Sequence, residues 1–249
     1  MQPFICTIAY DGTNYQGWQE QPGRPTIAGA LQQSFRDVFG APIKIVGASR
    51  TDAGVHAQGQ TARFFSNIVI DPNIMLMAWN RRLPADIVVT SLALAHAEFH
   101  PHRNVHQKEY NYVIYTKRPS PMIARYGWWY DRPLDLEKLQ QSLALLVGTH
   151  DFRSFCTGDE MTSTIRTIDE ITMYVEDNKI TIKLFGPSFL RYMIRRIVGA
   201  CVTISTKPYL TPANLQEILQ ACNPQHCLPT APACGLTLMH IMYQQSFIK

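Results

Sequence analysis

The chain has 249 residues, 46% of them hydrophobic, and a formal net charge of +4 from 23 Lys plus Arg against 19 Asp plus Glu. This composition excludes a wholly disordered protein, because it supplies enough apolar side chains for one large core or two small ones. The small positive charge permits a polyanionic partner without predicting one. No secretory signal opens the chain, and no apolar run approaches the ~20 residues of a membrane span, so we expect a cytoplasmic protein with no membrane association.

Strands and helices alternate along the first hundred residues. Alternating apolar residues predict strands at 4–10, 43–46, 60–65 and 86–92, and helical spacing predicts helices at 27–39 and 71–79. The stretch AYDGTNYQGWQ, after the first strand, is rich in turn-forming residues. The stretch RTDAGVHA is predicted to be a loop.

The polar segment HPHRNVHQK interrupts this pattern, so we place a subdomain boundary there, giving residues 1–104 and 105–249. Beyond it, strands are predicted at 109–115, 165–175 and 179–185, and helices at 135–147, 190–204 and 211–221. The mixture of strands and helices in both halves indicates the α/β (α+β) class.

The six cysteines allow two readings of the segment after the last predicted helix. Cys222, His226, Cys227 and Cys234 carry the ligand types that zinc prefers, but they lack the paired C-x2-C spacing of structural zinc sites. We therefore expect no metal and reduced thiols.

The segment GASRTDAGVHAQGQTARF places one carboxylate, Asp52, among small residues and beside Arg50. Gly54 gives this loop access to backbone conformations closed to other residues. An exposed catalytic carboxylate fits such a loop, but so does an aspartate that only caps a turn. The loop by itself leaves both readings open.

The loop GASRTDAGVHAQGQ resembles the signature of the TruA-type tRNA pseudouridine synthases. Further matches follow in the family's order: YDGTNYQGWQ, NRRLPADI, EYNYVIY, HDFRSF, STIRTI, FLRYMIRRIVG and TAPACGLTL. The resemblance spans nearly the whole chain. It implies the pseudouridine synthase fold, with two mixed α/β subdomains, a central and mostly antiparallel sheet, and an RNA-binding cleft between the subdomains.

The resemblance also implies a reaction. The N1–C1′ bond of uridine breaks, the uracil turns, and C5 bonds to C1′, with no redox change and no cofactor. Asp52 matches the family's catalytic carboxylate, which attacks C1′ or acts through a glycal that begins at C2′. The sequence decides neither route.

Arg195 is the expected counter-ion of Asp52, because it lies on an apolar helical stripe and matches the arginine that pairs with the catalytic aspartate in the family. From the residues alone, a structural salt bridge is the alternative. Arg191 and Arg196 beside it are interpreted as phosphate contacts or solvated charges.

Three further residues acquire roles from the resemblance. Tyr110 is expected to lie against the target base, although a tyrosine in this strand is also typical of a protein core. We interpret Tyr112, on the same face of the strand, as a core residue. Leu236 is expected to line the pocket, or simply to be buried in a strand. Arg50 is expected to fill the space that the flipped base vacates, or to brace its own loop.

The implied partners are tRNA, at uridines 38 to 40 of the anticodon stem-loop, and a second copy of the chain in a homodimer. Basic side chains are expected either to follow the RNA backbone or, taken singly, to be solvated surface charges: Arg81, Arg82, Arg103, Lys108, Lys117 and Arg118. The chain departs from the family at FHPHRNV and TIAGALQ, which touch the expected RNA or dimer surfaces.

Two other functions compete with this one. AYDGTNY resembles the first motif of HAD-like phosphohydrolases, but Ala9 stands where their nucleophile belongs. The non-enzyme alternative is an inactive RNA-binding protein of the same fold. The presence of Asp52, Tyr110 and Arg195 favours the enzyme.

Overall fold

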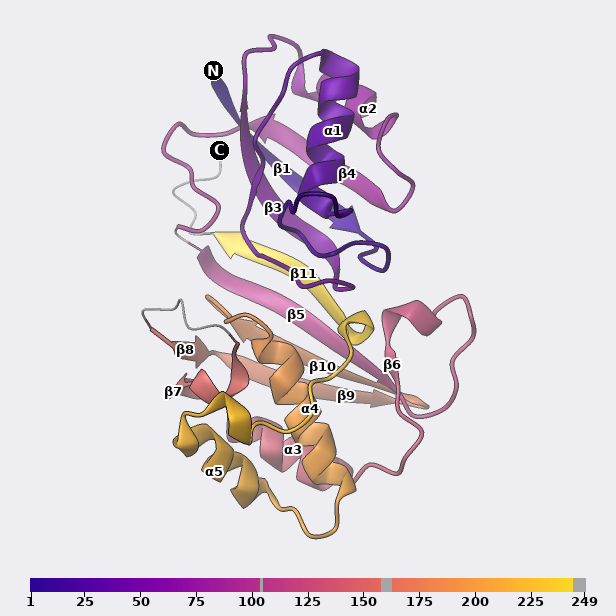
Figure 1. Cartoon of the computed structure of the whole chain (residues 1–249), viewed down its shortest axis with the longest axis vertical. Coiled ribbons are helices and arrows are strands. Elements are labelled where there is room, and N and C mark those ends of the chain that lie inside the picture. The colour runs from indigo at the N-terminus through magenta and orange to yellow at the C-terminus, as the bar shows by residue number, and fades with distance from the viewer. Residues whose placement is uncertain (104, 158–162, 244–249) are drawn as a thin grey trace. The chain divides into compact units, whose positions relative to one another are not determined.

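In a computed structural model the chain forms two compact units (Figure 1). The structure describes residues 1–103, 105–157 and 163–243. The first unit comprises Met1–Lys108 and the C-terminal segment that starts at Thr237, and the second comprises Glu109–Leu236. The boundary thus falls four residues after the one expected from the sequence, and the chain returns to the first unit for its last strand.

The first unit is built on β1 (Gln2–Tyr10), which pairs antiparallel with β3 (His56–Ser66) on one side and with β4 (Ile87–Leu94) on the other. The short β2 (Val46–Gly47) pairs antiparallel with β3, and β11 (Leu236–Tyr243) pairs parallel with it. Alternate residues of β1 are buried, as its sequence pattern predicts.

Two helices, α1 (Ile27–Phe39) and α2 (Pro72–Asn80), pack on this sheet (Figure 1). The side chain of Thr26 caps α1 by accepting from the Gly29 N–H. Phe35 of α1, Phe64 of β3 and Trp79 of α2 meet edge to face, with ring centroids 5.1 to 5.5 Å apart. This aromatic cluster is the core that holds the sheet and both helices together.

The second unit contains the remaining strands and three helices. Its strands are β5 (Val105–Tyr115, in this unit from Glu109), β6 (Trp128–Trp129), β7 (Gly148–Asp151), β8 (Ile165–Ile168), β9 (Glu170–Glu176) and β10 (Lys179–Gly186). Its helices are α3 (Leu136–Ala144), α4 (Met193–Thr206) and α5 (Pro212–Ala221). Short 3-10 turns lie at Ala124–Tyr126, Arg153–Phe155, Pro224–His226 and Ala233–Gly235. The pairs β9–β10 and β7–β8 are antiparallel, and β6 pairs parallel with β5.

The structure confirms the mixed α/β class with mostly antiparallel sheet. The strand predicted at 43–46 is wrong, because only Val46–Gly47 pairs. The strand predicted at 165–175 is broken at Asp169, whose N–H donates to the carbonyl of Phe185. The helix predicted from residue 190 begins at Met193, after Tyr192 in the left-handed conformation. Within the described ranges, no helix has the length and apolarity to cross a membrane.

Candidate active site

The loop that carries Asp52 leaves β2 at Gly47 and enters β3 at His56. A second loop, at residues 11–18, packs tightly against it, and two glycines make the approach possible. A Cβ on Gly12 would lie 2.0 Å from the Val55 oxygen, and one on Gly17, whose φ is +87°, would lie 2.6 Å from the Thr51 oxygen. The segment YDGTNYQGW therefore forms the support of the Asp52 loop.

Hydrogen bonds hold these two loops together. The N–H of Trp18 donates to the Thr51 carbonyl at 3.1 Å, and the N–H of Gly54 donates to the Tyr15 carbonyl at 3.2 Å. The hydroxyls of Tyr10 and Thr51 are 2.7 Å apart. Contacts of this kind fix the loop on both sides of Asp52.

The first residues of the loop are held from the β3 side. The Ala48 N–H donates to the Thr61 carbonyl at 2.7 Å. The fully buried Gln60 side chain accepts from the Ser49 N–H at 3.1 Å and donates to the Ser49 carbonyl at 2.7 Å. This role of Gln60 is not predictable from the sequence, because a glutamine in a strand is ordinarily expected to face solvent.

Asp52 and Arg50 differ from the residues that brace them. Ala48 and Thr51 are buried, whereas Asp52 is partly buried and Arg50 is exposed. The peptide carbonyl of Asp52 accepts from the Val55 N–H at 3.1 Å, which closes a turn around Ala53 and Gly54. A rigid backbone thus presents one carboxylate and one guanidinium, two residues apart.

The second unit places Arg195 on α4 and connects it to the segment before β11. Its Nε donates to the Ala231 carbonyl at 2.9 Å, and the Ala231 N–H donates to the Arg195 carbonyl at 3.0 Å. A Cβ on Gly199 would lie 2.0 Å from the Pro229 oxygen. Gly199 therefore admits this segment to the helix surface, and the segment in turn orients the Arg195 guanidinium.

Tyr110 and Leu236, the two expected pocket residues of this unit, are each 5% exposed. The Tyr110 ring meets Phe189, just before α4, edge to face at 5.3 Å. Leu236 follows Gly235, whose missing Cβ would lie 2.5 Å from the ring of Tyr112. Both residues thus flank the segments that hold Arg195.

Tyr112 is wholly buried, as expected for a core residue, and its hydroxyl donates to the Pro232 carbonyl at 2.8 Å. Burial raises the pKa of Tyr112, so the hydroxyl keeps its proton and remains a donor.

Two of the expected RNA contacts are wrong, because both side chains bind backbone carbonyls instead. Arg196 donates through Nη1 to the carbonyls of Ser154 and Cys156 at 3.1 and 3.0 Å. Lys108 is only 8% exposed and donates to the Ala48 carbonyl at 2.8 Å. A planar guanidinium suits several carbonyls at once, which explains the structural role of Arg196.

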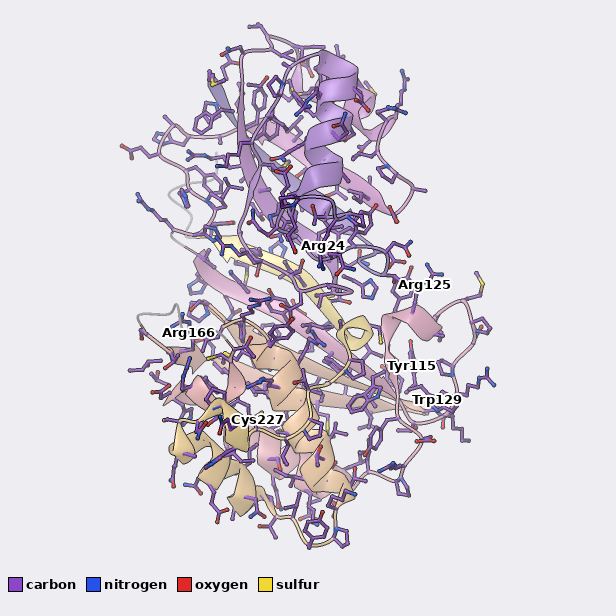
Figure 2. All side chains as sticks on the ribbon, viewed as in Figure 1. Arg24, Tyr115, Arg125, Trp129, Arg166 and Cys227 are labelled. Atoms are coloured by element: carbon purple, nitrogen blue, oxygen red, sulfur yellow. The ribbon has the colours of Figure 1, made fainter. Side chains whose placement is uncertain are left out.

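Other basic residues do lie on the surface. Lys117 and Arg118 are exposed, and the Arg118 guanidinium lies 5.7 Å from the centre of the Trp129 ring, which is 48% exposed. Figure 2 shows Arg125 and Trp129 at the same end of the second unit. In the first unit Arg82 is exposed and forms a 3.2 Å ion pair with Asp37.

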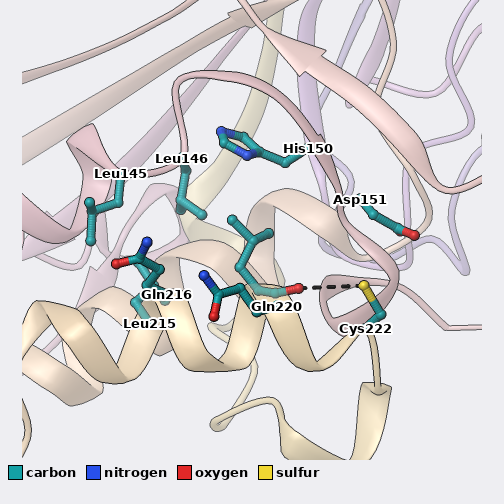
Figure 3. A pocket seen from close by; sticks show the side chains of 9 residues that line it. Leu145, Leu146, His150, Asp151, Leu215, Gln216, Gln220 and Cys222 are labelled. Carbon is teal, nitrogen blue, oxygen red and sulfur yellow. Dashed lines mark hydrogen bonds between the residues drawn. The ribbon is translucent and has the colours of Figure 1, made fainter.

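A pocket lies elsewhere in the second unit, between the end of α3 and α5 (Figure 3). Leucines and glutamines line it, together with His150, Asp151 and Cys222. None of the predicted site residues contributes to it.

The six cysteines form no disulfide. Cys222 donates to the Leu219 carbonyl and Cys234 to the Gly127 carbonyl. In the part of the chain that the structure describes, no three His, Cys, Asp or Glu side chains gather as metal ligands would.

Comparison with known proteins identifies the family. A family model described as tRNA pseudouridine synthase matches residues 7–102 and 143–244. Proteins named tRNA pseudouridine synthase A from Thermodesulfovibrio yellowstonii and Brevibacillus brevis are each 36% identical; the alignments cover 95% and 98% of this chain and 98% and 100% of theirs. The protein of that name from Mycoplasma genitalium is 34% identical over 98% of this chain and 100% of its own. The chain therefore belongs to the tRNA pseudouridine synthases, isomerases that convert uridine to pseudouridine in tRNA.

Proposed function

We propose that this protein isomerises uridines of the tRNA anticodon stem-loop and that Asp52 is its catalytic carboxylate. The observation that carries the proposal is the bracing of the Asp52 loop, whose backbone is fixed at Ala48, Ser49, Thr51 and Gly54. Catalysis by a single carboxylate needs this rigidity, because a reacting oxygen must stay within a fraction of an ångström of its position.

The chemistry assigned to Asp52 requires its ionised form. Attack on C1′ makes an ester to the ribose as the N1–C1′ bond breaks. The detached uracil then attacks C1′ through C5 and displaces the Asp52 carboxylate, after which C5 loses its proton and N1 gains one. In the glycal route Asp52 instead removes the proton from C2′. Both routes begin with a carboxylate and end with the same product, and we leave them open.

Arg195 is the proposed counter-ion of Asp52. A carboxylate shielded from water by bound RNA would take up a proton unless a cation stood beside it. The bond from Arg195 Nε to Ala231 supports this role, because it fixes the direction of the guanidinium before any substrate arrives.

Tyr110, Leu236 and Arg50 are assigned to binding. Tyr110 stacks on the target uracil and Leu236 forms an apolar wall, which accords with the position of both side chains next to the segments that hold Arg195. Arg50 is exposed on the loop of Asp52, so it is free to enter the RNA where the flipped uridine has left.

The partners follow from the family. We propose that tRNA binds through exposed basic and aromatic side chains such as Arg118 and Trp129. Basic side chains of this kind contact phosphates, and aromatic rings stack on unpaired bases. We also propose a homodimer, in which each copy completes the tRNA surface of the other. Since tRNA is the substrate, we expect the protein to act in the cytoplasm.

The test is release of tritium from C5 of uridine in tRNA, because this hydrogen leaves only when C5 bonds to C1′. We expect release by the unaltered protein and none above background by Asp52→Ala. Asp177→Asn, in the exposed turn between β9 and β10, is the control, because asparagine tolerates the left-handed backbone at this position. If the unaltered protein bound tRNA but released no tritium, the inactive RNA-binding alternative would replace this proposal.

A further inference from the structure

Lys108, at the end of the first unit, is buried. Contact with RNA phosphates at the surface therefore does not explain why a lysine is present there. Its ammonium donates to the Ala48 carbonyl at 2.8 Å. Across the described ranges no carboxylate forms an ion pair with it. Burial lowers the pKa of Lys108 to about 8, so keeping the ammonium at this position opposes folding.

The carbonyl that Lys108 binds is the entry to the Asp52 loop. The same oxygen lies 3.2 Å from Nδ1 of His102, which donates when that nitrogen carries the proton. Lys108 thus approaches Ala48 from β5, and His102 approaches it from the segment that precedes this strand. With the Ala48 N–H bound to the Thr61 carbonyl, both backbone polar groups of Ala48 are held.

Stability alone does not account for a lysine here. A methionine would fill much the same volume and would bury no charge, and His102 would still supply a donor to the carbonyl. A residue that opposes folding yet contacts the support of a catalytic loop is typical of positions where function and stability conflict.

We propose that Lys108 is a positioning residue, which together with His102 fixes the Ala48 carbonyl and so sets the backbone from which Arg50 and Asp52 project. This rests on the proposed function of Asp52. Lys108 itself has no contact with the substrate. Its effect is to keep the carboxylate at the geometry that the reaction needs.

The experiment compares Lys108→Met with Lys44→Met, which removes the same charge from an exposed position of the same unit. We expect kcat for tritium release from tRNA to fall about tenfold or more in Lys108→Met, with KM within about twofold of the unaltered protein. The melting temperature should stay equal or rise. Lys44→Met should match the unaltered protein in all three measurements.

Three results would overturn the assignment. A raised KM with unchanged kcat would make Lys108 an RNA contact, and a melting temperature that falls along with activity would make it a structural residue. Unchanged kcat and KM would leave it without a role. If the unaltered protein released no tritium, the proposed function would fail instead, so the two failures are distinguishable.

A second measurement is independent of activity. Amide hydrogen exchange in Lys108→Met should become faster at residues 49–54, while β1 and β3 keep their protection. The variant Lys108→Met/His102→Ala should lose more activity than the product of the two single losses, because the Ala48 carbonyl then has no side-chain donor. Unchanged exchange, or losses that multiply, would contradict the shared role.

Discussion

Different groups hold the Asp52 loop and the Arg195 region in place. Around Asp52, backbone groups and neighbours such as Thr51 and Gln60 form hydrogen bonds that hold the loop, and these bonds survive a change of the Asp52 side chain. Around Arg195, the functional side chain itself bonds to the Ala231 carbonyl and helps to build the structure. Substitutions should therefore separate activity from stability in the first region and combine them in the second.

The largest effect is expected from Asp52→Asn. The amide keeps the size of the side chain but cannot act as a nucleophile, so we expect turnover to fall by about a thousandfold or more. Affinity for tRNA and the melting temperature should hardly change, because binding comes from the basic surface. Filter binding and calorimetry check this against Asp177→Asn. A large loss of affinity for tRNA would show that Asp52 contributes to binding as well as to the reaction.

Arg196→Met should lower the stability of the fold, because Arg196 has a structural role in α4. It leaves the carbonyls of Ser154 and Cys156 without their donor, so we expect a loss of about 3 kcal/mol in the free energy of unfolding. Denaturant unfolding measures it, with the exposed Arg191→Met as the control. Equal stability of the two variants would show that the carbonyls find other partners.

The burial of Lys108 predicts a dependence of stability on pH. Its pKa is about 8 in the folded chain and 10.5 in the unfolded chain, so between these values the unfolded chain binds more protons and stability rises with pH. Between pH 8 and pH 10.5 the free energy of unfolding should rise by about 3 kcal/mol. The advantage of Lys108→Met over the unaltered protein should thus be largest at pH 7 and shrink by pH 10. An advantage that is constant with pH would mean that the lysine is not desolvated.

Arg50→Ala should have the smallest effect of the four. Because Arg50 is exposed on a loop held by other residues, its loss should raise KM about fivefold and leave the melting temperature unchanged. Steady-state kinetics at two salt concentrations test this, since a phosphate contact weakens as salt rises. A fall in melting temperature would instead support the alternative that Arg50 braces its loop.

The sequence predicted the elements with strong periodicity, such as β1 and α1. Family motifs assigned roles to Asp52, Arg195, Tyr110 and Leu236, and those roles stay predictions. It missed what depends on three-dimensional packing. Lys108 and Arg196 look like surface charges in a sequence, and only the fold shows them bound to carbonyls. The short strand β7 has four residues, too few for a periodic pattern, and forms only because β8 lies beside it.

The central claim is that Asp52 and Arg195, from different units, act as a pair. The most direct measurement is the dependence of kcat on pH in Arg195→Gln, which keeps a donor for Ala231 but removes the charge, because kcat reports ionisation in the complex with tRNA. Without the cation, a carboxyl shielded from water is harder to ionise, so the acidic limb of the profile should move to higher pH. An acidic limb at the same pH as in the unaltered protein, with only a lower rate, would contradict the pairing.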